Sequence, residues 1–210
     1  LRDEAADASR GAESVERAGQ GGARAARRLL ALDGEPVADL GALLAKIGVS
    51  VAQPGIVTSD ERMVVGMRAG GGAAAIVLET VRTKSAWGRR FELARGLGHL
   101  LLDPLRDGAA GAASSRFARA RRRRRSGAFA AEFLLPGSAL AEASGGVVDG
   151  AATPTEFVRL LQRYGVGART AAHQLWNHRW LSSADLRDGL IDSFAAECGD
   201  GEAGEGGGRS

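Results

Sequence analysis

One predicted helix, over residues 85–102, carries a histidine at the spacing of a metal-binding motif. Arg95 and His99 are four residues apart, so both side chains lie on the same face of that helix. Many zinc hydrolases bind their metal through the pattern His-Glu-x-x-His, in which two histidines hold the ion and the glutamate is the general base. Here the five positions read Arg95-Gly96-Leu97-Gly98-His99, so only the last residue of the pattern is present.

His99 alone does not make a catalytic zinc site, which needs three protein ligands and an open position for water. Arg95 keeps its proton in proteins and cannot bind a cation. Like charges about 4 Å apart also repel by about 4 kcal/mol at an effective dielectric constant of about 20. Gly96 has no group to take a proton from water, a loss of roughly 10²–10⁴-fold in rate. His173 and His178 are five residues apart, about 140° around a helix, so they do not form a joint site. We therefore expect no metal cofactor.

The positive charge of the chain is concentrated in one segment. The net charge is only +3 over 210 residues, yet Arg89–Arg125 holds eleven arginines against three acidic residues, whereas Ser183–Ser210 is acidic. The single cysteine, Cys198, excludes an internal disulfide framework and any cysteine-rich zinc module. No apolar run approaches the roughly 20 residues of a membrane span, and no charged-then-apolar leader opens the chain. We expect a cytoplasmic protein without membrane contact.

The apolar pattern predicts one α+β domain over residues 15–182. Helical spacing and capping residues predict helices over 15–32, 37–46, 85–102, 128–135, 153–164 and 168–179. Three short β-type runs, at 49–53, 63–67 and 74–78, are bounded by turn residues that favour a small antiparallel sheet. We expect residues 1–14 to be disordered, residues 105–127 to form a biased, arginine-rich loop, and residues 183–210 to form an acidic, glycine-rich disordered tail.

Four blocks of the chain resemble the ImmA/IrrE-type metallo-endopeptidase family, in the same order. RRFELARGLGHLLLDP (Arg89–Pro104) resembles the active-site helix of that family, and GAFAAEFLLP (Gly127–Pro136) is similar to its F-A-A-x-L-L-x-P block. YGVGARTAAHQLWNHRWL (Tyr164–Leu181) resembles its closing helix hairpin, and PVADLGALLAKIGVSV (Pro36–Val51) fits its typical start. Together the blocks cover about 16–182, and they imply a zincin-like fold with a C-terminal helical hairpin.

The departures from the family pattern fall on the expected active site. Arg95 stands at the first zinc-ligand position and Gly96 at the general-base position, while His99 keeps the second ligand position. The resemblance implies a third ligand, a glutamate shortly before the F-A-A block, where this chain has the run Arg121–Arg125. Active members of the family use zinc. This chain therefore resembles a degenerate member, and the resemblance gives no catalytic residue that we would assign to it.

The resemblance implies a bacterial protein that acts on repressor-type regulators, often of the XRE type. Our first hypothesis is a catalytically inactive member that binds or senses such a regulator. One alternative is an active zinc endopeptidase with an unconventional site. Another is a DNA-associated regulator that uses Arg121–Arg125 and the terminal hairpin, although no aromatic residues for base stacking lie within the run. The run could also be a solvated loop, or residues 105–125 an out-of-frame translation.

Overall fold

The computed structural model describes residues 1–10, 12, 14–52, 62–67, 74–79, 85–103, 110–112, 120–143 and 154–194. Helices make up most of these residues. The helices are α1 (Arg2–Ser9), α2 (Val15–Leu29), α3 (Leu40–Lys46), α4 (Ala86–Leu102), α5 (Ala120–Leu134), α6 (Gly137–Ala143), α7 (Pro154–Tyr164), α8 (Ala168–Asn177) and α9 (Ala184–Phe194). The strands are β1 (Val49–Ala52), β2 (Arg62–Met67), β3 (Ala74–Glu79) and β4 (Ala110–Ala112). None of the helices in these ranges combines the length and apolar character that crossing a membrane requires.

The sheet is mixed, with strand order β1-β3-β2-β4. β2 pairs antiparallel with both β3 and β4, but β1 pairs in parallel with β3, with Val49 opposite Ala74. The expectation of a purely antiparallel sheet is therefore wrong at this pair. The physical reason is topological: β2 does not pair with β1, and β3, which returns antiparallel to β2, takes the place beside β1.

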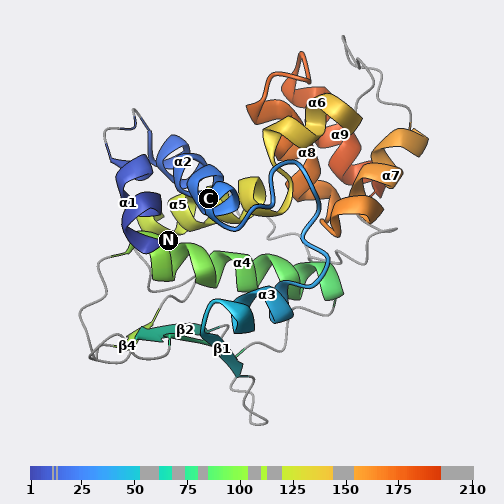
Figure 1. Ribbon diagram of the computed structural model, residues 1–210. Coiled ribbons are helices and arrows are strands. Elements are labelled where there is room, and N and C mark those ends of the chain that lie inside the picture. The colour runs from blue at the N-terminus through green and yellow to red at the C-terminus, as the bar shows by residue number, and fades with distance from the viewer. Residues whose placement is uncertain are drawn as a thin grey trace, which may run out of the picture.

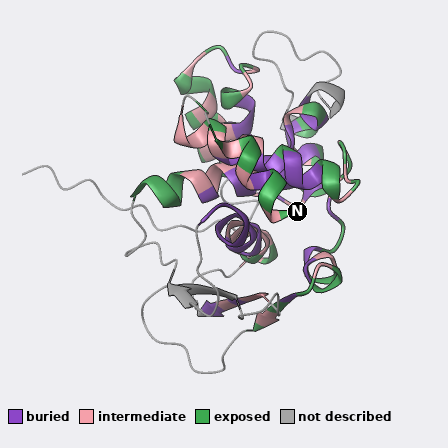
Figure 2. Cartoon of the chain, turned by 60° about the vertical axis from the view of Figure 1, so that its left-hand side comes forward, coloured by how far each residue is buried: buried purple, intermediate pink, exposed green. Residues whose placement is uncertain are grey.

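Helix α4 lies between the sheet and helices α1, α2 and α5 (Figure 1). The central strand β3 buries Ile76 and Leu78 fully or nearly so, two residues apart, so one face of that strand is covered. On the opposite side, α4 packs against α5, α1 and α2. Figure 2 shows buried residues gathered in the inner helices and exposed ones on the outer helices. The helix that carries residues 95–99 is therefore packed on both sides.

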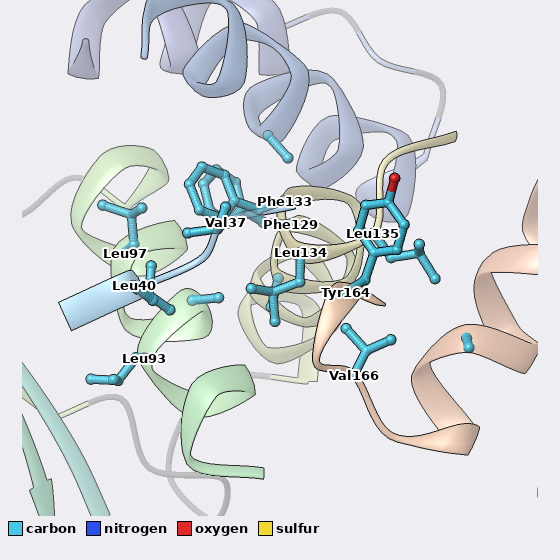
Figure 3. Close-up of a cluster of buried hydrophobic side chains, with 14 of the residues drawn as sticks. Val37, Leu40, Leu93, Leu97, Phe129, Phe133, Leu134, Leu135, Tyr164 and Val166 are labelled. Carbon is cyan, nitrogen blue, oxygen red and sulfur yellow. The ribbon is translucent and has the colours of Figure 1, made fainter. Parts of the chain in front are cut away.

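Helix α5 contributes two phenylalanine side chains to the hydrophobic core. Its rings Phe129 and Phe133 stack with centroids 5.5 Å apart, and both are fully buried. Figure 3 shows them in one cluster with Leu93 and Leu97 of α4. Helix α2 runs beside α5, and a Cβ at Gly19 would collide with the backbone of α5 there, so glycine allows the close approach.

The buried Arg27 of α2 fixes the connection from α2 to α3. Its Nε donates to the carbonyl oxygen of Asp33 at 2.8 Å, and its Nη atoms donate to carbonyl oxygens of Leu32, Glu35 and Phe133. Burial lowers the pKa of Arg27 from its ordinary value. One guanidinium thus holds both the turn after α2 and the end of α5.

Both ends of the chain differ from the disordered segments expected at 1–14 and 183–210. Helix α1 buries Ala5 completely, and Ser9 Oγ donates to the carbonyl oxygen of Ala18 on α2 at 2.9 Å. Helix α9 buries Phe194, whose ring lies 5.2 Å from that of Phe157 on α7. Neither helix has a strong apolar pattern in the sequence. Helix α1 buries only a small alanine, and α9 carries acidic residues around its apolar face. Residues 195–210 of the expected tail lie outside the described residues.

The expected loop at 105–127 is also partly replaced by regular structure. Helix α5 begins at Ala120 rather than near Ala128, so Arg121–Arg125 belong to its first turns, and β4 occupies 110–112. The biased composition suggested a loop, but arginine is a good helix former and the apolar half of α5 anchors the helix. Residues 104–109 and 113–119 lie outside the described residues.

Candidate functional site

Helix α4 has well-defined ends that set the position of its motif. Ser85 caps its start, where the side-chain Oγ accepts a hydrogen bond from the amide of Gly88 at 3.0 Å. Asp103 ends the helix in an extended conformation, and its amide donates to the carbonyl oxygen of His99 at 3.0 Å. The motif therefore occupies the C-terminal half of α4, which is largely buried.

Arg95, at the first ligand position, is held by its own helix. Its Nη1 donates to Glu92 Oε1 at 2.7 Å, three residues earlier on α4. Its Nε is buried and has no hydrogen-bond partner within the residues that the structure describes. Because a guanidinium offers only donors, this side chain has no lone pair for a metal ion.

Gly96, at the general-base position, faces the sheet. A Cβ built at Gly96 would lie 2.9 Å from two carbons of Ile76, and one built at Gly98 would lie 2.9 Å from the ring of Phe129. Both distances are shorter than real Cβ contacts. The two glycines therefore let α4 pack closely on β3 and on α5. Position 96 lacks a base and has no space for a larger side chain unless Ile76 moves.

His99 is the one ligand-type residue of the motif, and Asp103 orients its ring. His99 Nδ1 lies 2.7 Å from Asp103 Oδ2, and the side chains of both are almost completely buried. Burial raises the pKa of the Asp103 carboxyl, but the hydrogen bonds and charges of His99 and Arg125 outweigh it, so this pKa lies below its ordinary value. The carboxylate is then an acceptor, and Nδ1 carries the proton. His99 Nε2 is buried with no partner in the described parts of the chain.

The run Arg121–Arg125 divides by position along α5. Arg125 forms an ion pair with Asp103 Oδ1, which reaches back to α4. Arg121–Arg124 are exposed at the start of the helix, and Arg124 Nη1 lies 3.6 Å from Glu16 Oε1 on α2. The described part of the run thus supplies a cation, not a carboxylate, beside the candidate site.

His173 lies on α8 and His178 directly follows that helix, and the two residues have different surroundings. Burial and the charges of Arg187 and Arg169 lower the pKa of His173. His178 Nε2 lies 2.9 Å from Glu132 Oε2 on α5.

Glu132 forms a second buried polar cluster that the sequence did not reveal. Its carboxylate accepts hydrogen bonds from Gln174 Nε2 at 2.9 Å and from the amide of Gly137 at 3.4 Å, in addition to its contact with His178. Arg24 Nη1 lies 3.6 Å away. Burial raises the pKa of Glu132, but these partners outweigh it and the net pKa is lowered. The available signal was one glutamate among the apolar residues of GAFAAEFLLP.

Zinc does not fit the donors that surround His99. Within the described ranges no three His, Cys, Asp or Glu side chains form a group that could hold a metal ion. The two nearby carboxylates are already paired, Glu92 with Arg95 and Asp103 with Arg125. A dication there would meet two guanidinium charges and find one imidazole nitrogen, where three ligands are needed. Sequence reasoning located Arg95, Gly96 and His99 but missed both carboxylates.

A comparison with protein families gave a match that covers the candidate site. The family model described as the IrrE N-terminal-like domain matches residues 67–175, just over half of the chain. No curated protein sequence matches the chain. The match spans β3, α4, α5 and most of α8, and so includes every residue of the candidate site around His99.

Proposed function

The chain belongs to the family of IrrE N-terminal-like domains, and we propose that it is a member without peptidase activity that works by binding a regulator protein. One observation carries the loss of activity: the side chains at the motif are committed to contacts within the protein. Arg95 is paired with Glu92, and Gly96 is packed against Ile76. His99 is left as a single imidazole.

Hydrolysis of a peptide bond by a zincin needs a metal-bound water and a base that removes its proton. Neither group is supplied by the motif of this chain. Removal of a general base alone lowers rates by roughly 10²–10⁴-fold, and removal of the metal takes away the nucleophile itself. The alternative of an active endopeptidase would require ligands from residues other than those described around His99.

Binding of a regulator is the role that remains if the fold is kept and the chemistry is lost. The resemblance to ImmA/IrrE-type proteins suggests a repressor-type partner, such as one of the XRE type, in the bacterial cytoplasm. Helices α8 and α9 each expose one large hydrophobic side chain, Trp176 and Leu186 respectively, and we assign these two residues to such contact. Aromatic residues of this kind often dominate protein interfaces.

Metal analysis and a mixing experiment test the proposal. Purified protein should contain no stoichiometric zinc, and should bind a repressor encoded beside its gene without cleaving it. A gel records cleavage, and size-exclusion chromatography records the complex. Trp176→Ala should weaken the complex, with the exposed Leu29→Ala as a matched control. Stoichiometric zinc that is lost in His99→Ala, together with repressor cleavage, would favour the endopeptidase alternative.

Polyanion binding is a second candidate, favoured by the exposure of Arg121–Arg124 at the start of α5. Helix N-termini favour negative charge, so a bound anion would offset the unfavourable interaction of these arginines with the helix dipole. The terminal hairpin supports this candidate less, because α9 packs on α8 and Arg187 lies over the ring of Trp176. Salt-dependent DNA binding that disappears when Arg121–Arg124 are changed to serine would support it.

A further inference from the structure

We infer that an ion-pair chain, Arg125–Asp103–His99, has taken the place of a metal ion as the link between α4 and α5. The inference rests on the proposed loss of the metal and adds what holds the site together without it. It assigns a role to Arg125 and Asp103, the residues that make the site unsuitable for zinc. The consequence is a domain whose folding does not depend on a metal.

Asp103 lies between His99 and Arg125. Its two carboxylate oxygens point to two different elements: Oδ2 contacts His99 Nδ1 at 2.7 Å, and Oδ1 contacts Arg125 of α5. The side chains of Asp103 and His99 are 8% and 1% exposed, and that of Arg125 is 25% exposed. Because the contacts are buried, removal of one partner would leave an uncompensated charge, which costs more than breaking a surface ion pair.

Arg125 is the last arginine of the run Arg121–Arg125. The resemblance implies a third metal ligand in the stretch just before the F-A-A block, and Arg125 lies in that stretch. Arg125 crosses from α5 to α4, as a ligand from α5 would do, whereas its neighbour Arg124 pairs with Glu16 of α2. The contact between the two helices is kept, but an ion pair now makes it.

The charges of the two arginines at the site are balanced by two carboxylates. A bound zinc ion would bring two positive charges to this place, and Arg95 and Arg125 bring two. Each guanidinium is paired with a carboxylate of α4 or of its C-cap, Glu92 in one case and Asp103 in the other. The site is therefore electrically satisfied, and any added dication would be repelled by both arginines.

Packing on both sides of α4 supports the same conclusion. Gly98 brings the ring of Phe129 close to the backbone of α4, one residue before His99. At the C-cap, Arg2 Nη2 of α1 donates to the carbonyl oxygen of Asp103 at 3.2 Å. The end of α4 is thus fixed by two other helices, and His99 is held in a defined orientation even though no metal is required.

Thermal unfolding of the full chain tests the inference, with and without EDTA. EDTA should move the midpoint by less than about 1 °C, since no metal contributes. Arg125→Ser should lower the midpoint by roughly 5 °C or more, and the matched variant Arg124→Ser by less than about 2 °C. Asp103→Asn combined with Arg125→Ser should cost less than the sum of the single changes, because the two side chains share one interaction.

A second measurement keeps the test independent of folding yield. Nitrogen NMR of the imidazole should show the proton of His99 on Nδ1. The Nδ1 resonance should shift in Arg125→Lys, because lysine keeps the positive charge but lacks the planar guanidinium group. If EDTA releases stoichiometric zinc and lowers the midpoint, both this inference and the proposed function are wrong. If no zinc is found but Arg125→Ser behaves like Arg124→Ser, this inference fails and the proposed function stands.

Discussion

Glu132 Oε2 lies 2.9 Å from His178 Nε2, although 46 positions separate the two residues in the sequence. The contact joins the end of α5 to the segment that follows α8, and Gln174 of α8 adds a second hydrogen bond at 2.9 Å. Arg24 brings α2 to the same carboxylate. This cluster fastens the C-terminal helices to the rest of the domain, independently of the site around His99.

Acid should weaken the domain through Glu132. The pKa of this carboxyl is lowered in the folded protein, so the contribution of Glu132 is fully present above the ordinary value of 4.5. It is lost as the pH falls from that value through the lower, folded pKa, because the unfolded chain binds the proton more readily than the folded protein does. We expect the free energy of unfolding, measured with urea between pH 3 and pH 7, to fall less below about pH 4.5 in Glu132→Gln than in the unchanged protein.

The neutral variant should also be less stable at pH 7. Glu132→Gln keeps the shape but loses the charge-assisted contact with His178, at a cost of about 1–3 kcal/mol in the free energy of unfolding. The exposed variant Glu35→Gln serves as a matched control and should change it by less than about 0.5 kcal/mol. A free energy of unfolding in Glu132→Gln that equals that of the control would contradict the role of the cluster.

Arg27→Lys should destabilise the protein although it keeps the positive charge. A lysine has no planar fork, so it cannot reach the carbonyl oxygens of Asp33, Glu35 and Phe133 together, and buried acceptors are left unpaired. We expect a loss of about 2–4 kcal/mol, measured by urea unfolding. Arg28→Lys, one residue later and exposed, should have almost no effect. Equal effects of the two changes would argue against the anchoring role of Arg27.

Much of the motif helix could be predicted from the sequence because its signals are local. Ser85 as cap and Asp103-Pro104 as stop give the bounds of α4 to within a residue, and Arg95, Gly96 and His99 follow from spacing alone. The partners of His99 could be predicted only in part. Asp103 stands four residues after His99, which is a visible signal, but its pairing with Arg125 spans 22 positions and depends on how α4 and α5 pack.

The differences from the predicted fold at α1, at the start of α5 and at α9 have a common cause. Composition indicated a loop or a disordered end wherever charged, small or glycine residues dominate, at α1, at the start of α5 and at α9. Each of these helices gains its stability from a few contacts with distant elements, as Phe194 does from Phe157. Tertiary packing therefore overrides weak local preference, and no local pattern announces it.

Gly96→Ala should destabilise the domain, unlike a typical glycine-to-alanine change in a helix. Its Cβ would lie 2.9 Å from Ile76, a fully buried residue, so β3 or α4 has to shift at a cost of about 1–3 kcal/mol. Gly127→Ala in α5 is the matched control, because nothing lies within 4 Å of its Cβ. That change should stabilise the protein by about 0.5–1 kcal/mol. Ile76→Val combined with Gly96→Ala should regain part of the lost free energy of unfolding. Urea unfolding of the unchanged protein, the two glycine variants and this double variant measures the effects.

Restoring the motif should not restore a stable zinc site. Arg95→His together with Gly96→Glu would supply a second imidazole and a base, but the new glutamate side chain would meet Ile76, and α5 still presents Arg125 to Asp103. Two imidazoles fall short of the three ligands that a catalytic zinc needs. After dialysis the double variant should hold well under one equivalent of zinc by atomic emission, and should show no zinc-dependent cleavage of casein. Full zinc occupancy with a chelator-sensitive midpoint would show that a further ligand is supplied by other residues of the chain.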